Sequence, residues 1–176
     1  MRRLIHYSYE PLTEVYSVKQ DDSVRGHRGW LKPFGLWVSC QGDGDWIEWC
    51  EAESWRDYKH ATQIVLAREA NILRITNSAK WLEFDRNYVT PSSNDYRPEK
   101  VHWEAVARSY QGIIICPHLG EHRLSMDNMW YNGWDCASGC IWDKEAIARL
   151  VPLPEEQARL RRMGYDNARV PEIIID

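Results

Sequence analysis

Two runs near the N-terminus combine residue types that could bind a planar ligand. His6 and Ser8 alternate along a short apolar and aromatic run, and Gly35, Trp37 and Ser39 alternate along a second one. A glycine permits close approach of the backbone, a tryptophan offers a ring face, and a histidine with a hydroxyl can bind an amide. Together they indicate a pocket for an amide-bearing ring. The structural alternative is a core His6 bonded to a backbone carbonyl and a core Trp37.

A later segment, from Trp130 to Cys140, is rich in rings, small residues and polar groups. Loops of such composition often carry binding groups. Within it, Asp135 stands between Trp134 and Cys136, and a carboxylate in these surroundings is expected in a dry cleft with an altered pKa. The alternative for Asp135 is a turn or helix-capping aspartate.

The cysteines favour neither a metal site nor a nucleophile. Cys116, Cys136 and Cys140, with His118 and His122, are soft ligands, but no Cys-x2-Cys pair or zinc-finger spacing is present, so we predict no metal site. Cys116 follows an apolar run, where cysteines are usually inert. An odd total of five cysteines indicates free thiols in a reducing compartment, and we expect a cytoplasmic protein.

Composition restricts the class of protein. A chain of 176 residues with 44% hydrophobic and 27% charged residues matches one globular domain, residues 1–176. No stretch approaches the roughly 20 apolar residues of a membrane helix, and no signal-peptide pattern is seen, so we expect no membrane association. A net charge of −4 excludes a general nucleic-acid-binding footprint. The 10 Trp and 9 Tyr, against 2 Phe, suit half-wet clefts.

Strands and helices must position these residues, and hydrophobic periodicity with turn residues predicts both. Strands are expected at 4–9, 34–40, 62–67, 71–75, 113–116 and 138–142, with 62–67 and 71–75 forming a hairpin. Helices are expected at 45–58 with Asp45 as N-cap, 78–84, 101–110, 144–149 with Asp143 as N-cap, and 155–163. The stretches 11–33, 87–100 and 117–133 are expected to be irregular.

The order of these motifs resembles the ADP-ribosyltransferase superfamily. The resemblance spans about residues 4–150 and rests on four stretches: the His-x-Ser strand, the Gly-Leu-Trp-Val-Ser strand, Tyr110-Gln111-Gly112-Ile113-Ile114, and the acidic or polar stretch ahead of Cys140-Ile141-Trp142-Asp143-Lys144-Glu145-Ala146-Ile147. The sequence is similar to the His-Tyr-Glu branch, with the poly(ADP-ribose) polymerases and RNA 2′-phosphotransferases, and to compact phage and bacterial enzymes. The resemblance implies an α+β fold with a split β-sheet core and flanking helices.

The resemblance also implies a reaction, with NAD as substrate. The carboxylate of Asp135 would stand where the family has a glutamate, polarise the ribose 2′-hydroxyl and stabilise an oxocarbenium-like state. Aspartate is one methylene shorter, so the sequence departs from the family here. The acceptor of ADP-ribose would be a protein or nucleic acid, or water, chosen by the loops at 17–33 and 87–100.

The implied binding residues follow the family position by position. His6 would contact the nicotinamide ribose, and Trp37 would replace the family's tyrosine as the ring that stacks on nicotinamide. The opposite face would come from Trp46 or Trp49. Backbone and hydroxyl contacts would come from Ser8, Gly35, Ser39 and Ser138.

Two hypotheses without catalysis are alternatives to the enzyme. In one, the Trp-rich cleft binds a nucleotide, a modified base or a partner without turnover. In the other, exposed Trp and Tyr side chains form the interface of an interaction or inhibitor protein. Nicotinamide release from NAD separates the enzyme from both.

Overall fold

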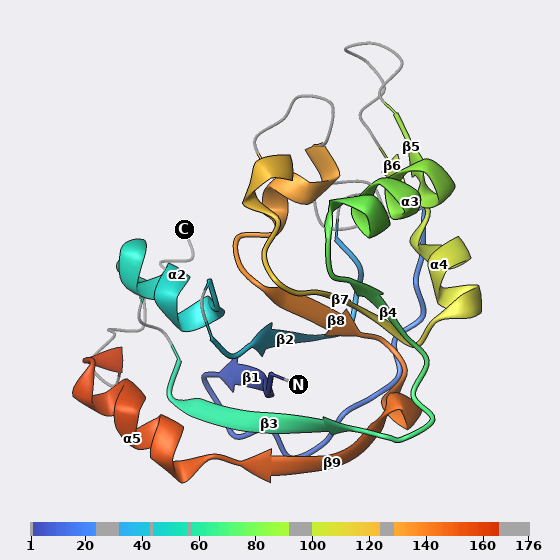
Figure 1. Cartoon of the computed structure of the whole chain (residues 1–176). Coiled ribbons are helices and arrows are strands. Elements are labelled where there is room, and N and C mark those ends of the chain that lie inside the picture. Colours follow the sequence, from blue (N-terminus) through green and yellow to red (C-terminus); the bar gives the residue numbers. More distant parts are fainter. Residues whose placement is uncertain are drawn as a thin grey trace, which may run out of the picture.

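The structure is a computed structural model that describes residues 2–23, 32–42, 44–55, 58–91, 100–123 and 129–165. Within these ranges the chain is a mixed α+β fold with a curled seven-stranded sheet, a two-stranded sheet and four α-helices (Figure 1). The strands are β1 (Leu4–Ser8), β2 (Leu36–Cys40), β3 (His60–Leu66), β4 (Ile72–Ile75), β5 (Val89–Thr90), β6 (Lys100–Val101), β7 (Gly112–Ile115), β8 (Ser138–Ile141) and β9 (Ile147–Pro152). The helices are α2 (Trp46–Ala52), α3 (Ser78–Tyr88), α4 (Trp103–Ser109) and α5 (Pro154–Arg162).

The large sheet places the first strand of the chain near its centre. Its strand order is β4-β7-β8-β2-β1-β3-β9, and β5 pairs with β6 in the small sheet. Only β4 and β7 are parallel among the described strands of the large sheet, and every other neighbouring pair is antiparallel. The sheet curls, so that β3 and β9 lie below β1 and β2 in Figure 1.

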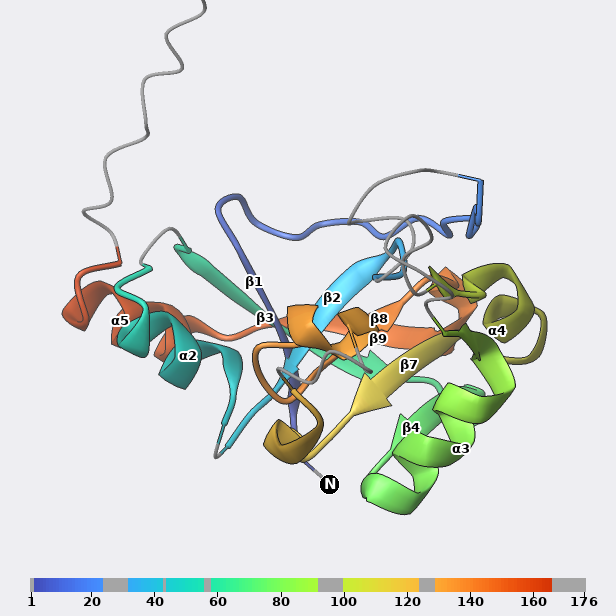
Figure 2. The ribbon, with the colours of Figure 1, turned by 90° about the horizontal axis from the view of Figure 1, so that it is seen from above.

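Helices cover two parts of the sheet, with the strands between them (Figure 2). On one side α3 and α4 pack with the 3-10 helix Met129–Gly133 over the ends of the sheet nearest β4 and β7, around the buried rings of Trp81, Trp103 and Trp130. On the other side α2 and α5 cover β1 and β3 through Ile47, Leu160 and neighbouring apolar side chains. A third cluster, with Leu4, Val38, Ile64 and Ile141, joins the curled strands to one another.

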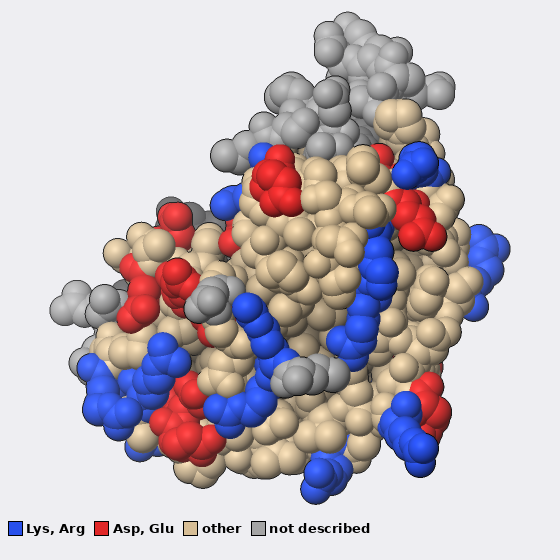
Figure 3. Space-filling view, viewed as in Figure 1, with Lys and Arg blue, Asp and Glu red and all other residues tan. Residues whose placement is uncertain are grey.

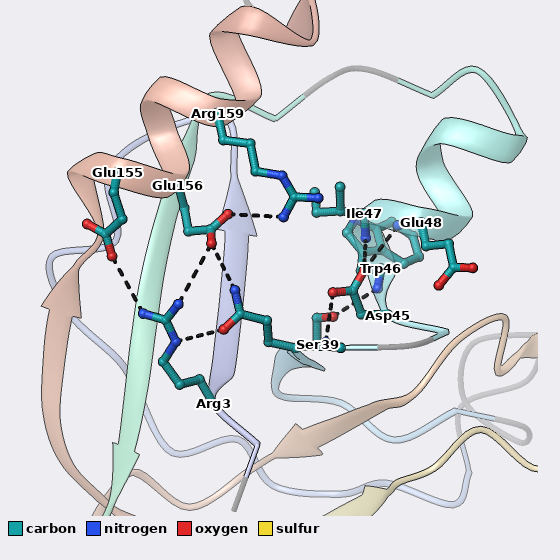
Figure 4. Close-up of polar contacts among 11 residues, drawn as sticks. Arg3, Ser39, Asp45, Trp46, Ile47, Glu48, Glu155, Glu156 and Arg159 are labelled. Atoms are coloured by element: carbon teal, nitrogen blue, oxygen red, sulfur yellow. Dashed lines mark hydrogen bonds and ion pairs between the residues drawn. The ribbon is translucent and has the colours of Figure 1, made fainter.

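An ion-pair network holds α5 against the central strands (Figure 4). The guanidinium of Arg3 lies 3.5 Å from Glu155 and 3.8 Å from the buried Glu156, and Gln41 donates to Glu156 across 2.8 Å. Arg159 pairs with the second oxygen of Glu156 at 3.5 Å. A buried carboxylate needs such partners because loss of hydration would otherwise be costly.

Most expected elements are confirmed with changed ends. The strands at 4–9, 34–40, 113–116 and 138–142 correspond to β1, β2, β7 and β8, and the helices at 78–84, 101–110 and 155–163 correspond to α3, α4 and α5. Asp45 is the N-cap of α2, since its carboxylate accepts from the backbone N–H groups of Ile47 and Glu48. The helix ends at Ala52 rather than near residue 58, and α3 continues to Tyr88.

Two expectations about strand pairing and helix type are wrong, and the stretch 87–100, expected to be irregular, contains the end of α3, strand β5 and the first residue of β6. The predicted hairpin of 62–67 with 71–75 is absent, because β3 pairs with β1 and β9 while β4 pairs with β7. The hydrophobic periodicity predicts that both segments are strands, but it does not determine which strands they pair with. The predicted helix 144–149 is instead the short 3-10 helix Lys144–Ala146, capped by Asp143, followed by β9. Pairing along β3 outweighs the local helix preference of these residues.

The loops that were expected to choose an acceptor are only partly described. Residues 24–31 and 92–99, within the predicted loops 17–33 and 87–100, lie outside the described residues. Among the helices that are described, none combines the length and apolar character needed to cross a bilayer.

Candidate functional site

The strands β1 and β2 separate at His6. Among the described residues, these strands pair through Leu4 with Cys40 and Ile5 with Ser39, whereas β1 continues its pairing with β3 as far as Ser8. At the point of separation, Nδ1 of His6 lies 2.8 Å from the backbone carbonyl oxygen of Trp37. A carbonyl only accepts, so the neutral ring carries its proton on Nδ1 and leaves Nε2 as an acceptor.

The hydrogen bond from His6 to the Trp37 carbonyl matches the structural alternative, in which His6 is a core histidine bonded to the backbone. Burial lowers the pKa of His6 below its usual value, and the hydrogen bond to Trp37 opposes this effect in part. The ring is therefore held neutral near neutral pH. A neutral imidazole with a free acceptor nitrogen is chemically able to accept a hydrogen bond from a hydroxyl group.

The ring of Trp37 contacts Trp134 and Lys32. The Trp37 and Trp134 ring centroids are 5.0 Å apart with the planes inclined by 57°, and the ammonium of Lys32 lies 5.3 Å from the Trp37 ring centroid. The Lys32 side chain also packs on the backbone of Gly133, because a Cβ added at Gly133 would lie 2.5 Å from it. Trp37 is only partly buried, so part of its surface is in contact with solvent.

Two buried serines lie on the neighbouring strands β2 and β8. Ser39 of β2 lies opposite Ser138 of β8. The Ser39 hydroxyl oxygen accepts from the backbone N–H of Trp46 across 2.9 Å, which joins β2 to the start of α2 (Figure 4). Ser138 donates to the carbonyl of Cys136 across 3.0 Å. Both hydroxyls thus have structural partners, and β2 and β8 bring them side by side.

The carboxylate of Asp135 is held by an arginine. Arg123 Nη2 donates to Asp135 Oδ1 across 2.7 Å, and the Asp135 side chain is 22% exposed. The adjacent Trp134 is buried, so the chain places an ion-paired carboxylate next to the Trp37–Trp134 contact. A bonded guanidinium orients the carboxylate and leaves Oδ2 for another group.

Four further predicted residues, Ser8, Gly35, Trp46 and Trp49, make other contacts. Ser8 donates to the carbonyl of Glu10 across 2.6 Å. Gly35 has a φ of +146°, and a Cβ there would lie 2.5 Å from the carbonyl oxygen of Ile141, so the close approach is to β8. Trp49 stacks on Trp46, with ring centroids 4.7 Å apart, in the cluster under α2. The ring that contacts Trp37 is Trp134.

The thiols near the site are buried. All five cysteines are free, and only Cys116 among them is partly exposed. Burial raises the pKa of Cys136 to about 12, with the hydrogen bond from Ser138 acting in the opposite direction, and burial also raises the pKa of Cys40 and of Cys140. Such thiols are poor nucleophiles.

The histidines considered as metal ligands have other contacts. Nε2 of His118 lies 2.7 Å from the carbonyl oxygen of Trp134, and the His122 ring is parallel to the ring of Trp81 at 4.2 Å. Over the described ranges, no group of three or more His, Cys, Asp or Glu side chains is arranged to hold a metal ion.

Sequence reasoning missed Lys32 and Arg123, and it named Trp134 without a role. Lys32 precedes the Pro33 that opens the second strand run, and Arg123 lies in an irregular stretch, so neither has a sequence signal. Their contacts, of Lys32 with the ring of Trp37 and of Arg123 with the carboxylate of Asp135, are seen only in the folded chain.

The chain was compared with protein-family models, with curated proteins and with solved structures, and none of them matches it.

Proposed function

We propose that this protein cleaves the nicotinamide–ribose bond of NAD and transfers ADP-ribose to a protein or nucleic acid, or to water. The observation that supports this proposal is a series of contacts that links His6 to Trp37 and Trp37 to Trp134, the residue before Asp135, although His6, Trp37 and Asp135 come from three distant segments. His6 bonds the Trp37 carbonyl, Trp37 contacts Trp134, and Asp135 follows Trp134 directly. These are the residues that the resemblance to ADP-ribosyltransferases indicates.

Trp37 and Asp135 are chemically suited to the two groups that the scissile bond joins, nicotinamide and ribose. Nicotinamide is a planar amide-bearing ring, and Trp37 offers a partly exposed indole for stacking. The carboxylate of Asp135 would face the ribose, where positive charge develops as the bond breaks. Lys32 and Arg123 bring positive charge to the same region, which favours the diphosphate of NAD.

The proposed reaction conserves atoms and electrons. The C1′–N1 bond breaks, its electron pair neutralises the pyridinium, and nicotinamide leaves. An oxygen or nitrogen of the acceptor then forms a bond to C1′ and loses a proton to a base. Nε2 of His6, the acceptor atom of the neutral ring, would hold a ribose hydroxyl while this exchange proceeds.

Nicotinamide release from NAD by the purified protein tests this proposal, with and without cell lysate as a source of acceptor. We expect Asp135→Asn to lower kcat about 100-fold or more, and Trp37→Ala to raise KM for NAD. Asp21→Asn and Trp55→Ala are matched controls, because both side chains are exposed and neither forms a hydrogen bond, ion pair or ring contact with His6, Trp37 or Asp135 in the described part of the chain. Absence of release and of NAD binding by the wild type would contradict the proposal.

A specific surface favours the interaction protein as second candidate. The stacked rings of Trp46 and Trp49 continue to Trp55, which is 46% exposed, and Tyr58 meets Trp46 edge-on. Exposed Glu48, Glu51 and Glu53 lie along the same helix and its end, which favours a basic partner. For this candidate, Trp55→Ala would abolish binding of the partner, while Asp135→Asn would not.

A further inference from the structure

A pocket lies at the end of the sheet where β4 and β7 terminate together. These strands are parallel, with Ile75 opposite Ile115, so the residues that follow them, Thr76 and Cys116, reach the same edge. Both residues line a pocket of about 280 Å³. The space beyond the carboxyl ends of parallel strands is a common position for ligands in mixed sheets.

Two arginines, one in β4 and one just before β1, border this pocket. Arg74 belongs to β4 and Arg2 precedes β1, and both line the cavity. Figure 3 shows Lys and Arg side chains (blue) on both sides of an uncharged surface in the middle of the face that it draws. Paired guanidinium groups around a concave surface favour an oxyanion, because each donates through a planar fork.

The position of Arg2 is restricted by the backbone. Gly42 has a φ of +130°, and an added Cβ there would lie 3.3 Å from the guanidinium carbon of Arg2. The guanidinium therefore packs closely on the turn after β2.

The rest of the lining is apolar or weakly polar. It consists of Leu4, Cys40, Ile114 and Pro117. Inorganic phosphate would use the arginines alone, whereas a phosphate carrying a small organic group would also cover this apolar surface. The volume is sufficient for a small organic ligand rather than for a dinucleotide.

We infer that this pocket binds a small phosphate monoester, with Arg2 and Arg74 holding the phosphate and the apolar lining holding its organic group. The site is distinct from the one proposed for NAD. Leu4, Cys40 and Ile114 belong to the cluster that joins the curled strands, whereas Trp37 and Trp134 pack with the cluster under α3 and α4. The inference therefore does not depend on NAD cleavage.

A cysteine in the lining, Cys116, allows ligand binding to be followed by chemical modification. Cys116 lines the pocket and is the cysteine that is partly exposed, while the other four are buried. The rate at which a neutral alkylating reagent such as iodoacetamide modifies Cys116 should therefore fall when a ligand fills the cavity. A neutral reagent is needed because an anionic one would itself be attracted to the arginines.

The experiment measures alkylation of the full chain by mass spectrometry, with phenyl phosphate, inorganic phosphate, or sodium chloride at equal ionic strength. We expect phenyl phosphate to protect Cys116 at lower concentrations than inorganic phosphate does, and chloride to give no protection. Arg74→Gln should raise the protecting concentration roughly tenfold or more, and so should Arg2→Gln. Arg149→Gln removes the same charge from the exposed side of β9 and should leave protection unchanged.

Two variants keep the inference falsifiable if one of them fails to fold. Arg2 is exposed and precedes β1, so Arg2→Gln should leave the sheet intact even if Arg74→Gln disturbs β4. Equal protection by chloride, or protection that survives Arg2→Gln in the folded protein, overturns the inference. Nicotinamide release has no part in this readout, so failure of the NAD proposal would leave the result interpretable.

Discussion

The indole of Trp130 donates a hydrogen bond to Asp85 across 2.9 Å and thereby joins the 3-10 helix Met129–Gly133 to α3. Asp85 is partly buried, and this burial raises the pKa of its carboxyl above the usual value, although the bond from Trp130 lowers it in part. The packing of α3 on the sheet is therefore linked to pH.

We expect the contribution of Asp85 to the free energy of unfolding to fall as the pH rises from about 4 through the raised pKa of this carboxyl. The folded chain holds this proton more tightly than the unfolded chain, so stability is greatest where the carboxyl is protonated in both states. Asp85→Asn keeps an oxygen that accepts from Trp130 but does not titrate. Urea denaturation at several pH values should show the variant gaining stability relative to wild type as pH rises. A difference that is constant with pH would contradict this prediction.

His6 should produce the opposite dependence at higher pH. Its pKa is lowered by burial, so the folded ring takes up a proton only at a lower pH than the unfolded ring does. Its contribution to the free energy of unfolding is complete above about 6.5 and is lost as pH falls through the folded pKa. NMR titration, with the signal assigned from His6→Asn, measures that pKa directly. A pKa at or above the ordinary histidine value would show that burial does not control this ring.

Gly35→Ala should destabilise the protein by about 2 kcal/mol or more. The positive φ disfavours any side chain, and the new Cβ would lie 2.5 Å from the carbonyl oxygen of Ile141. Gly120→Ala is the matched control, because its Cβ would come no closer than 3.9 Å to His118 and its φ is not positive. Urea denaturation compares the two. Similar losses for both variants would rule out the strain at Gly35 as the cause.

Trp81→Ala should cost about 3–5 kcal/mol of unfolding free energy, because a fully buried ring leaves a cavity. Trp81 is 1% exposed and lies between the rings of His122 and Trp130, at 4.2 and 5.5 Å. Trp55→Ala removes the same side chain from a position that is 46% exposed and should cost less than about 1 kcal/mol. Thermal and urea unfolding of the pair test this, and equal costs would mean that the stack is not essential to the core.

Local elements were predictable where one residue determines them. Asp45 could be identified as an N-cap because its short carboxylate follows a glycine-rich turn and precedes an amphipathic run. The run Ile113-Ile114-Ile115 could be identified as a central strand because it is apolar on both faces. Both assignments use information within a few residues.

Which strands pair with one another could not be predicted from such short stretches of sequence. Nothing in the sequence of 62–67 distinguishes a hairpin with 71–75 from pairing with β1 and β9. The same limitation applies to the site: the sequence marks His6, Trp37 and Asp135 as candidates, but the carbonyl partner of His6, the cation of Arg123 and the ring of Trp134 depend on strand order. The curled seven-stranded sheet supports the α+β class, and the specific ADP-ribosyltransferase fold stays a proposal.

The pairing of β2 with β8 has a consequence for the kinetics of folding. Ser39 and Ser138 lie opposite one another although roughly one hundred residues separate them in the chain. Closing so long a loop is entropically slow, and folds dominated by such contacts typically form in milliseconds to seconds. During synthesis on the ribosome, Trp37 would therefore wait for most of the chain to emerge before it could meet Trp134, so a nascent or truncated chain would lack the assembled site.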